Sequence, residues 1–190
     1  APHGSSEGRF GTNPIAFAFP TAGEPVVLDF ATSGVIVADA VLSSRTGGAL
    51  PPGCAWDSEG NPTTDPVAAL AGAFAVWGGH RGSGLAIAIQ LFGILCGGGA
   101  LPADYKDCGF LALAFKPDLF MDEAEFRAKA SAYAEVVRAS RRLDPAVPIR
   151  MPFDRSAEFR ARALEAGGFD VDPQVLAQLK RMAQGAAVST

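Results

Sequence analysis

The sequence predicts a mixed fold of strands and helices, of the α+β class. Two short apolar segments near the start, residues 15–19 and 26–30, have the alternating or β-branched pattern of strands. The last third instead repeats apolar residues at helical spacing, after Asp122 and again in 173–184. Frequent glycine and proline, 22 and 14 residues, mark the turns between these elements.

The first thirty residues are expected to form a loop followed by the two strands. Residues 1–11 have a loop-like composition, and His3 within them is interpreted as a surface residue. Strand 26–30 is expected to be buried, and Asp29 is its anomaly because a buried carboxylate needs partners. Two interpretations stay open: Asp29 bonds to neighbouring backbone N–H groups, or it reaches a ligand.

A helix is expected after the second strand, capped by Thr32 or Ser33 and ended by Gly47. Residues 50–66 then contain four prolines and are expected to form an extended, ordered loop over the core. Acidic residues in this loop resemble a calcium site only loosely, because the spacing and the terminal Glu of an EF-hand are absent.

A glycine-rich stretch at residues 78–85, GGHRGSGL, leads into the apolar run 85–95. Glycine lets a backbone approach a ligand closely, and unpaired N–H groups at a helix start attract phosphate or carboxylate. With His80 and Arg81 as polar contacts, this stretch is a candidate anion cradle. An ordinary glycine-rich turn is the alternative, and spacing alone favours neither. The run 85–95 is expected to be a helix that stops at the glycines 97–99.

Residues 110–115, FLALAF, are the clearest buried strand of the chain, because large apolar residues alternate with alanine. A helix then starts at Asp122 and turns an apolar stripe toward the core. After a proline-rich connector, two further helices are expected at about 156–166 and 173–184, the second capped by Asp172.

The charge balance argues against polyanionic partners. A net charge of −4 gives no overall positive field for nucleic acid or an acidic membrane surface. The basic residues from Arg138 to Arg150 are interleaved with acidic ones, so they are interpreted as a solvated helix face. The longest apolar run, 85–95, is about half of the ~20 residues that span a membrane. Neither nucleic acid nor a membrane is an expected partner.

Cysteine and histidine are too few for a metal or disulfide framework. Three cysteines without a CxxC pair and two histidines give no convincing zinc site, so no metal is expected. A reduced, cytoplasmic setting is the simplest inference. The chain begins at Ala1 without an initiator methionine, so we expect a processed or truncated product, or the later part of a longer polypeptide.

Familiar nucleotide and nucleophile motifs are missing from the sequence. No Lys-Ser or Lys-Thr follows the glycine-rich stretch as in a Walker loop, and no GxGxxG opens a first βα unit. With His3 and His80 as the two histidines, no Ser-His-Asp or Cys-His system is marked by its context. What remains is a site in which an anionic ligand meets Arg81 and main-chain N–H groups.

Several motifs follow one another along the chain: GTNPIAFAFP, LDFATS, LPPG with PTTDP, GGHRGSGL and MPFD. This order resembles the malate/L-lactate dehydrogenase-like family of NAD(P)-dependent oxidoreductases. Its members include ureidoglycolate dehydrogenase, diketogulonate reductase and piperideine-2-carboxylate reductase. The resemblance covers essentially the whole chain, and motifs in register are more specific than any one alone.

The resemblance implies a non-Rossmann nicotinamide-binding fold, with a largely antiparallel sheet flanked by helices, in a homodimer. Residues 1–150 would form the cofactor-binding domain, and 151–190 the helical end of a second domain whose N-terminal part is absent. The cofactor would be NAD or NADP. Its implied contacts are Asp29, Phe30, Ala31, His80, Arg81, Gly82, Phe153 and Asp154.

Three departures from the family pattern limit this assignment. Arg81 stands where the family usually has Lys, and it adds a planar fork suited to phosphate, such as the 2′-phosphate of NADP. MPFD replaces a Pro-Gly-Glu-like segment, which makes Phe153 and Asp154 the least secure contacts. The family's catalytic His and its substrate-binding Arg and Ser groups belong to a preceding segment that this chain does not include.

The expected activity is hydride transfer between NAD(P)H and a small-molecule substrate, a 2-oxo acid, 2-hydroxy acid or cyclic imino acid. No catalytic residue is assigned within the chain, and His80 is the one candidate for proton transfer. The acid/base group would come from a separate N-terminal segment. The alternative is a non-catalytic nucleotide-binding or interaction module, or an inactive fragment, that keeps the fold. The substrate and the choice between NAD and NADP stay open.

Overall fold

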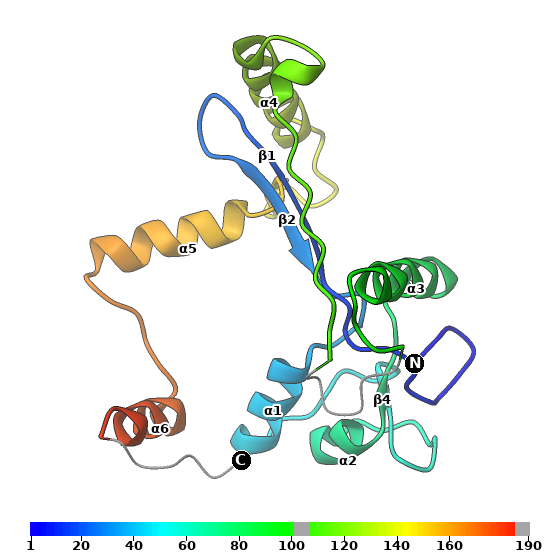
Figure 1. The fold of residues 1–190 in the computed structure, drawn as a ribbon. Helices are drawn as coiled ribbons and strands as arrows, with labels where there is room; N and C mark the ends of the chain where they lie inside the picture. The colour runs from blue at the N-terminus through cyan, green and yellow to red at the C-terminus, as the bar shows by residue number, and fades with distance from the viewer. Residues whose placement is uncertain (101–106, 185–190) are drawn as a thin grey trace. The chain divides into compact units, whose positions relative to one another are not determined.

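The computed structural model describes residues 1–100 and 107–184, and the chain divides into two compact units, Ala1–Ser131 and Ala132–Thr190. Helices and small antiparallel sheets together give the expected mixed class (Figure 1). The first unit holds β1 (Ile15–Phe19), β2 (Val26–Phe30), α1 (Val37–Thr46), β3 (Ala55–Trp56), α2 (Pro66–Ala71), β4 (Ala73–Phe74), α3 (His80–Leu95) and the 3-10 turn η1 (Pro117–Leu119). Helix α4 (Glu123–Arg138) begins in the first unit and ends in the second, which also holds α5 (Asp154–Glu165) and α6 (Pro173–Ala183).

Strands β1 and β2 form an antiparallel hairpin at the bounds that the sequence predicts, with Ile15 opposite Phe30. The connecting turn is closed by Thr21, whose hydroxyl donates to the carbonyl of Glu24 at 2.7 Å. The expected burial of β2 is wrong, since Leu28 in its middle is exposed. Strand β2 belongs to a sheet of only two strands. So small a sheet does not bury its apolar side chains by itself, although the pattern of β2 is typical of a buried strand.

The second antiparallel pair, β3 and β4, belongs to the small core of the first unit. These strands are two residues long each, and Ala55 lies opposite Phe74. Strands this short show no period in the sequence, so neither of them was predictable. The core cluster joins residues of α1, β3 and α2 with loop residues: Val35, Ala40, Leu50, Cys54, Ala55 and Ala69, with Phe74 packed against them.

Helix α1 begins later than expected, and neither predicted residue caps it. Its N-cap is Ile36, which makes no side-chain capping bond. The Thr32 hydroxyl is used elsewhere, because it donates to the carbonyl of Thr12 at 3.0 Å. Ser33 forms an isolated β-bridge and does not precede the helix directly. The predicted end at Gly47 is confirmed.

Helix α3 begins at His80 and not at Leu85, so most of the glycine-rich stretch is helix and not a loop before it. The helix start coincides with a close backbone contact between residues five apart, which the apolar period does not report. A Cβ added to Gly82 would lie 1.8 Å from the carbonyl oxygen of Trp77, so the first turn of α3 packs directly on the preceding backbone. The predicted end of the helix before the glycines 97–99 is confirmed.

Residues 110–115 are not the buried strand that the sequence predicts. They form no strand in the structure, and Phe110, Leu113 and Phe115 are exposed. A strand needs a neighbouring strand to satisfy its N–H and C=O groups. No backbone hydrogen bond joins these residues to another part of the described chain. The strand-like pattern is therefore present without a pairing partner.

The C-terminal helices agree with the sequence within two residues at each end of α5 and α6. Asp122 precedes α4 and accepts the N–H of Glu125 at 3.0 Å, as the capping pattern predicts. Asp172 accepts the N–H groups of Gln174 and Val175 at the start of α6. The stripe that the sequence predicts to face the core consists of Phe126, Ala130, Tyr133 and Val137, and it is wrong at Tyr133, which is exposed. Along the described ranges, none of the helices is both long and apolar enough to cross a membrane.

Candidate functional site

The candidate site begins at the N-terminus of α3. The residues before the helix, Gly78 and Gly79, have φ values of 64° and 60°, a left-handed backbone that glycine adopts without strain. Gly79 is the N-cap, and it has no side chain with which to cap the helix. The first N–H groups of a helix have no intrahelical partner. The N–H of Arg81 donates to the carbonyl of Gly78 at 3.3 Å, whereas the N–H groups of His80 and Gly82 have no hydrogen-bond partner among the described residues.

Two basic side chains occupy this first turn, and no acidic one does. His80 and Arg81 are both exposed. Among the described residues, the Arg81 guanidinium has no hydrogen-bond or ion-pair partner. A cation at the positive end of a helix dipole is unfavourable. A bound anion would relieve this conflict, so the turn has the electrostatics of an anion site.

The end of β2 lies against the residue that leads into α3. The indole Nε1 of Trp77 donates to the carbonyl of Ala31 at 2.9 Å. The ring of Phe30 meets the indole edge to face, with centroids 5.6 Å apart. Phe30 and Ala31 thus contact Trp77, which lies three residues before the start of α3.

Asp29 offers an unengaged carboxylate at the edge of this site. It lies opposite Ala16 in the hairpin and is exposed. Within the described ranges, it accepts no hydrogen bond from a neighbouring N–H group, which was one of the two interpretations of this residue. Because Asp29 is exposed, it needs no internal partner, and it is free to accept hydrogen bonds from a ligand.

The glycines of the first two turns of α3 have different surroundings. Gly82 is buried on the carbonyl of Trp77, so it is required by packing. A Cβ added to Gly84 would meet no atom within 4 Å outside the helix's own backbone. The open side of α3 is therefore at Gly84, while Gly82 holds the helix against Trp77.

His3 lies beside the candidate site, which the sequence analysis did not predict. Its backbone N–H donates to the hydroxyl of Ser83 at 3.1 Å. The rings of His3 and His80 have centroids 6.3 Å apart at an angle of 62°. His3 is exposed, as expected, but it stands next to the other histidine of the chain. The contact spans 77 residues of sequence, and no local signal announces it.

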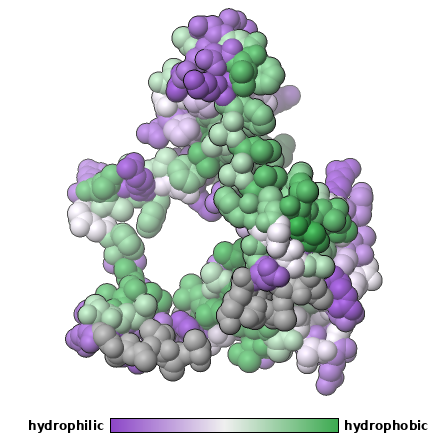
Figure 2. Space-filling model, in the orientation of Figure 1, coloured by the Kyte–Doolittle hydropathy of each residue, from purple (hydrophilic) through white to green (hydrophobic). Residues whose placement is uncertain are grey.

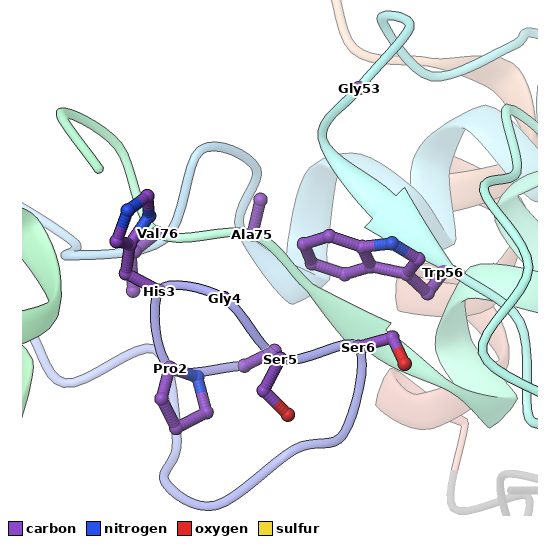
Figure 3. Close-up of a pocket in the computed structure, with 10 residues that line it drawn as sticks. Pro2, His3, Gly4, Ser5, Ser6, Gly53, Trp56, Ala75 and Val76 are labelled. Carbon is purple, nitrogen blue, oxygen red and sulfur yellow. The ribbon is translucent and has the colours of Figure 1, made fainter. Parts of the chain in front are cut away.

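A cavity of about 510 Å³ adjoins His3. Figure 3 shows the imidazole of His3 near Val76 at one end and the indole of Trp56 at the other, with the hydroxyls of Ser5 and Ser6 along the loop. Val76 bridges to Ser33, whose hydroxyl oxygen is buried and has no hydrogen-bond partner in the described structure. The unpartnered hydroxyl therefore belongs to the residue that pairs with Val76, and Val76 lines the cavity.

The remaining two candidate residues belong to the second unit. Phe153 is the N-cap of α5 and is half exposed, with a φ of 75°. Asp154 accepts two hydrogen bonds from Arg138, at 3.0 and 2.8 Å, and one from the N–H of Met151 at 2.8 Å. The Arg138 guanidinium holds the pKa of the Asp154 carboxyl below its usual range. Asp154 is thus already engaged in holding the start of α5 to the end of α4.

The rest of the titratable chemistry is sparse. Across residues 1–100 and 107–184, no group of three or more His, Cys, Asp or Glu side chains is arranged to hold a metal ion. Cys54 is buried in the core, where burial raises the pKa of its thiol. Its Sγ donates to the carbonyl of Pro51 at 2.8 Å.

Comparison with known proteins defines the family. Residues 1–180 match the family model described as malate/L-lactate dehydrogenase, so the chain belongs to that family. The resemblance carried by the GTNP, LDFATS and GGHRGSGL motifs is thereby confirmed.

Three relatives illustrate the match. Delta(1)-pyrroline-2-carboxylate reductase 2 of Burkholderia multivorans is 40% identical over 181 residues, covering 88% of this chain and 51% of that protein. L-sulfolactate dehydrogenase of Methanocaldococcus jannaschii is 33% identical over 190 residues, covering 96% of this chain and 54% of that protein. The crystal structure of a dehydrogenase from Sinorhizobium meliloti has a TM-score of 0.83 at 34% identity, over 95% of this chain and 55% of that one. The chain spans about half the length of these relatives.

Proposed function

We propose that this chain carries the cofactor-binding part of an NAD(P)-dependent oxidoreductase. Membership of the malate/L-lactate dehydrogenase family supports the class of reaction. The observation that carries the proposal is the first turn of α3. There Arg81 is unpaired among the described residues, and the N-cap Gly79 leaves backbone donors uncapped.

The residues around Trp77 fit a dinucleotide in their donor and acceptor chemistry. A pyrophosphate is an anion that the α3 N–H groups and the Arg81 fork would bind. The hydroxyl groups of the ribose can donate hydrogen bonds, which the exposed carboxylate of Asp29 would accept. The unpartnered Ser33 hydroxyl adds a polar atom close to the same edge. Phe30, Ala31, His80 and Gly82 complete the proposed contacts in this unit, and Phe153 and Asp154 stay proposed contacts from the second.

The cofactor, this chain and the rest of the enzyme have separate roles in the proposed reaction. When bound, the nicotinamide supplies or accepts the hydride. The chain's own residues bind and orient the dinucleotide by its charged groups. We assign the proton transfer to a histidine outside this chain, as the family resemblance implies. His80 is the candidate within the chain, and His3 is its neighbour.

The proposed substrate is a small acid with a reducible or oxidisable carbon next to its carboxylate. The names of two relatives support this class, since one reduces a cyclic imino acid and the other oxidises sulfolactate. Both names describe reactions in which one hydride is added to, or removed from, a carbon bonded to nitrogen or oxygen. We therefore propose a 2-oxo acid, 2-hydroxy acid or cyclic imino acid as the substrate of the full assembly.

Further parts of the proposal rest on the resemblance. They are a non-Rossmann arrangement of the cofactor-binding fold, a homodimer, a cytoplasmic setting, and a division into residues 1–150 and 151–190. A guanidinium suits bidentate binding of phosphate, so Arg81 would favour NADP over NAD if it meets the 2′-phosphate in place of the pyrophosphate.

The test is a calorimetric titration of the purified chain with NADH and with NADPH. We expect at least one of them to bind, and Arg81→Ala to weaken that binding about tenfold, or ~1.4 kcal/mol, because a charge-assisted phosphate contact is lost. Arg81→Lys keeps the charge and is expected to retain most of the affinity.

Arg141→Ala is the matched control, because it removes an exposed arginine that belongs to the second unit and not to α3. It is expected to leave the affinity unchanged. Absence of binding by both nucleotides, or an equal loss in the Arg81 and Arg141 variants, would refute the proposal.

A further inference from the structure

Helix α3 is apolar around its whole circumference beyond its first turn. From Leu85 to Leu95 its one polar side chain is Gln90, which is engaged with the carbonyls of Gly99 and Ala100. Leu91 and Leu95 are nevertheless 59% and 77% exposed. A helix that is apolar on all sides is normally buried in the interior of a larger structure. The exposed apolar side chains of α3 therefore indicate a surface that another polypeptide segment buries.

Residues 110–115 present the same feature in extended form. Phe110 is 84% exposed and Leu113 is 71% exposed. Leu111, Leu113 and Phe115 lie at every second position, so in a paired strand they would face one way and the alanines between them the other. The backbone N–H and C=O groups of the segment make no hydrogen bond to other described residues. The segment therefore has the side-chain pattern of a strand and backbone groups that are free to pair with a neighbouring strand.

Close contacts between glycines hold these two pieces together. A Cβ added to Gly109 would lie 1.8 Å from the carbonyl oxygen of Gly93 in α3. One added to Gly98 would lie 2.4 Å from the N–H nitrogen of Gly109. The end of α3 and the start of residues 110–115 thus pack backbone against backbone. We call residues 87–95 and 110–115 together the apolar face, and Figure 2 shows apolar residues gathered over α3.

We propose that the apolar face is the contact surface for the part of the family's polypeptide that this chain does not span. That part supplies a β-strand that pairs with residues 110–115 and apolar side chains that cover α3. It acts in this way whether it is joined to this chain or is a separate one. The family's other members are about twice as long as the region that matches, so a polypeptide of the required size belongs to the family.

The shape of the apolar face favours this occupant over a second copy of the chain. A symmetric contact between two copies covers a patch with the same patch of the other copy. Helix α3 exposes Ile87, Leu91 and Leu95, at successive turns, and Phe92 beside them. Residues 110–115 carry apolar side chains in both directions. Both elements have the composition of an interior, which calls for cover from more than one side.

This inference is independent of the proposed cofactor site, which lies at the opposite end of α3. The probe is the half of the Burkholderia multivorans reductase that this chain does not match, co-expressed with the complete chain. Light scattering would measure the mass of the complex, and hydrogen exchange would report on residues 110–115. We expect a 1:1 complex in which these amides exchange at least tenfold more slowly than in the chain alone.

Leu113→Asp and Leu143→Asp are the matched variants, since both leucines are exposed and only Leu113 belongs to the apolar face. We expect Leu113→Asp to weaken the complex at least tenfold and Leu143→Asp to change it less than twofold. Circular dichroism would show that both variants are folded. The inference is overturned by the absence of a complex, by equal effects of the two variants, or by a homodimer that already protects residues 110–115.

Discussion

At the scale of single residues, Gly82 and Gly84 in α3 have opposite surroundings. Gly82 is pressed on the carbonyl of Trp77, and Gly84 faces open space. Alanine at Gly82 forces a backbone shift at a packed contact, which costs about 2 kcal/mol in the free energy of unfolding. Alanine at Gly84 improves helix propensity and adds about 0.5–1 kcal/mol. Urea unfolding of both variants measures these changes, and equal changes in stability would contradict the assignment.

Phe153 is a second residue whose backbone conformation affects the stability of the chain. Its φ of 75° lies in the left-handed region, which costs a non-glycine residue about 1–2 kcal/mol. Phe153→Gly removes this strain but loosens the unfolded chain, so we expect a net gain of about 0.5–1 kcal/mol. Phe153→Ala keeps the strain and is the control. Thermal unfolding distinguishes them, and a glycine variant less stable than the alanine variant would contradict the strain.

At the scale of elements, the Arg138–Asp154 pair fixes the start of α5 to the end of α4. Because Arg138 lowers the pKa of Asp154 in the folded chain, the carboxylate contributes stability above its unfolded pKa of about 3.9. That contribution is lost as the pH falls through the lower, folded pKa. The partly exposed pair contributes at most about 1 kcal/mol.

Asp154→Asn is therefore expected to destabilise the chain by that amount at pH 6 and by progressively less below pH 4. Urea unfolding of the wild type and the variant across this range measures the difference. A difference that stays constant down to pH 3 would show that the ionisation of Asp154 does not contribute.

Local chemistry explains which elements the sequence predicts. The hairpin of β1 and β2 and the caps Asp122 and Asp172 depend on residues within a few positions of one another, and they are confirmed. The start of α3 coincides with the contact of Gly82 with Trp77, which is close in sequence but is a backbone packing contact that the apolar period does not report. Residues 110–115 have the pattern of a strand, but a strand also needs a neighbour, which sequence period does not supply.

The candidate site was predictable in its polar residues but not in its geometry. His80 and Arg81 are prominent because glycines surround them, and Asp29 because it interrupts an apolar strand. The contact between Trp77 and Ala31, which joins these groups, spans 46 residues and has no local signal. The same holds for His3 beside His80. Long-range contacts of this kind follow from the fold and not from any one motif.

At the scale of the whole molecule, the first unit combines a small core with a large exposed apolar surface. Its buried cluster consists mostly of small residues, with alanine at three of its six positions. Most of the large apolar side chains, including those of α3 and residues 110–115, are exposed. Burial of large apolar groups supplies most of the stability of a domain. This unit therefore gains its full stability when the apolar face is covered.

The central claim is that the first turn of α3 and the end of β2 bind a nicotinamide dinucleotide. The most direct measurement is the change in backbone amide NMR signals of the chain on addition of NADPH and of NADH. The expected result is that the largest shifts fall on residues 80–84 and 29–31, and that Arg81→Ala needs about tenfold more nucleotide to produce them. Shifts confined to other residues, or unchanged by Arg81→Ala, would contradict the claim.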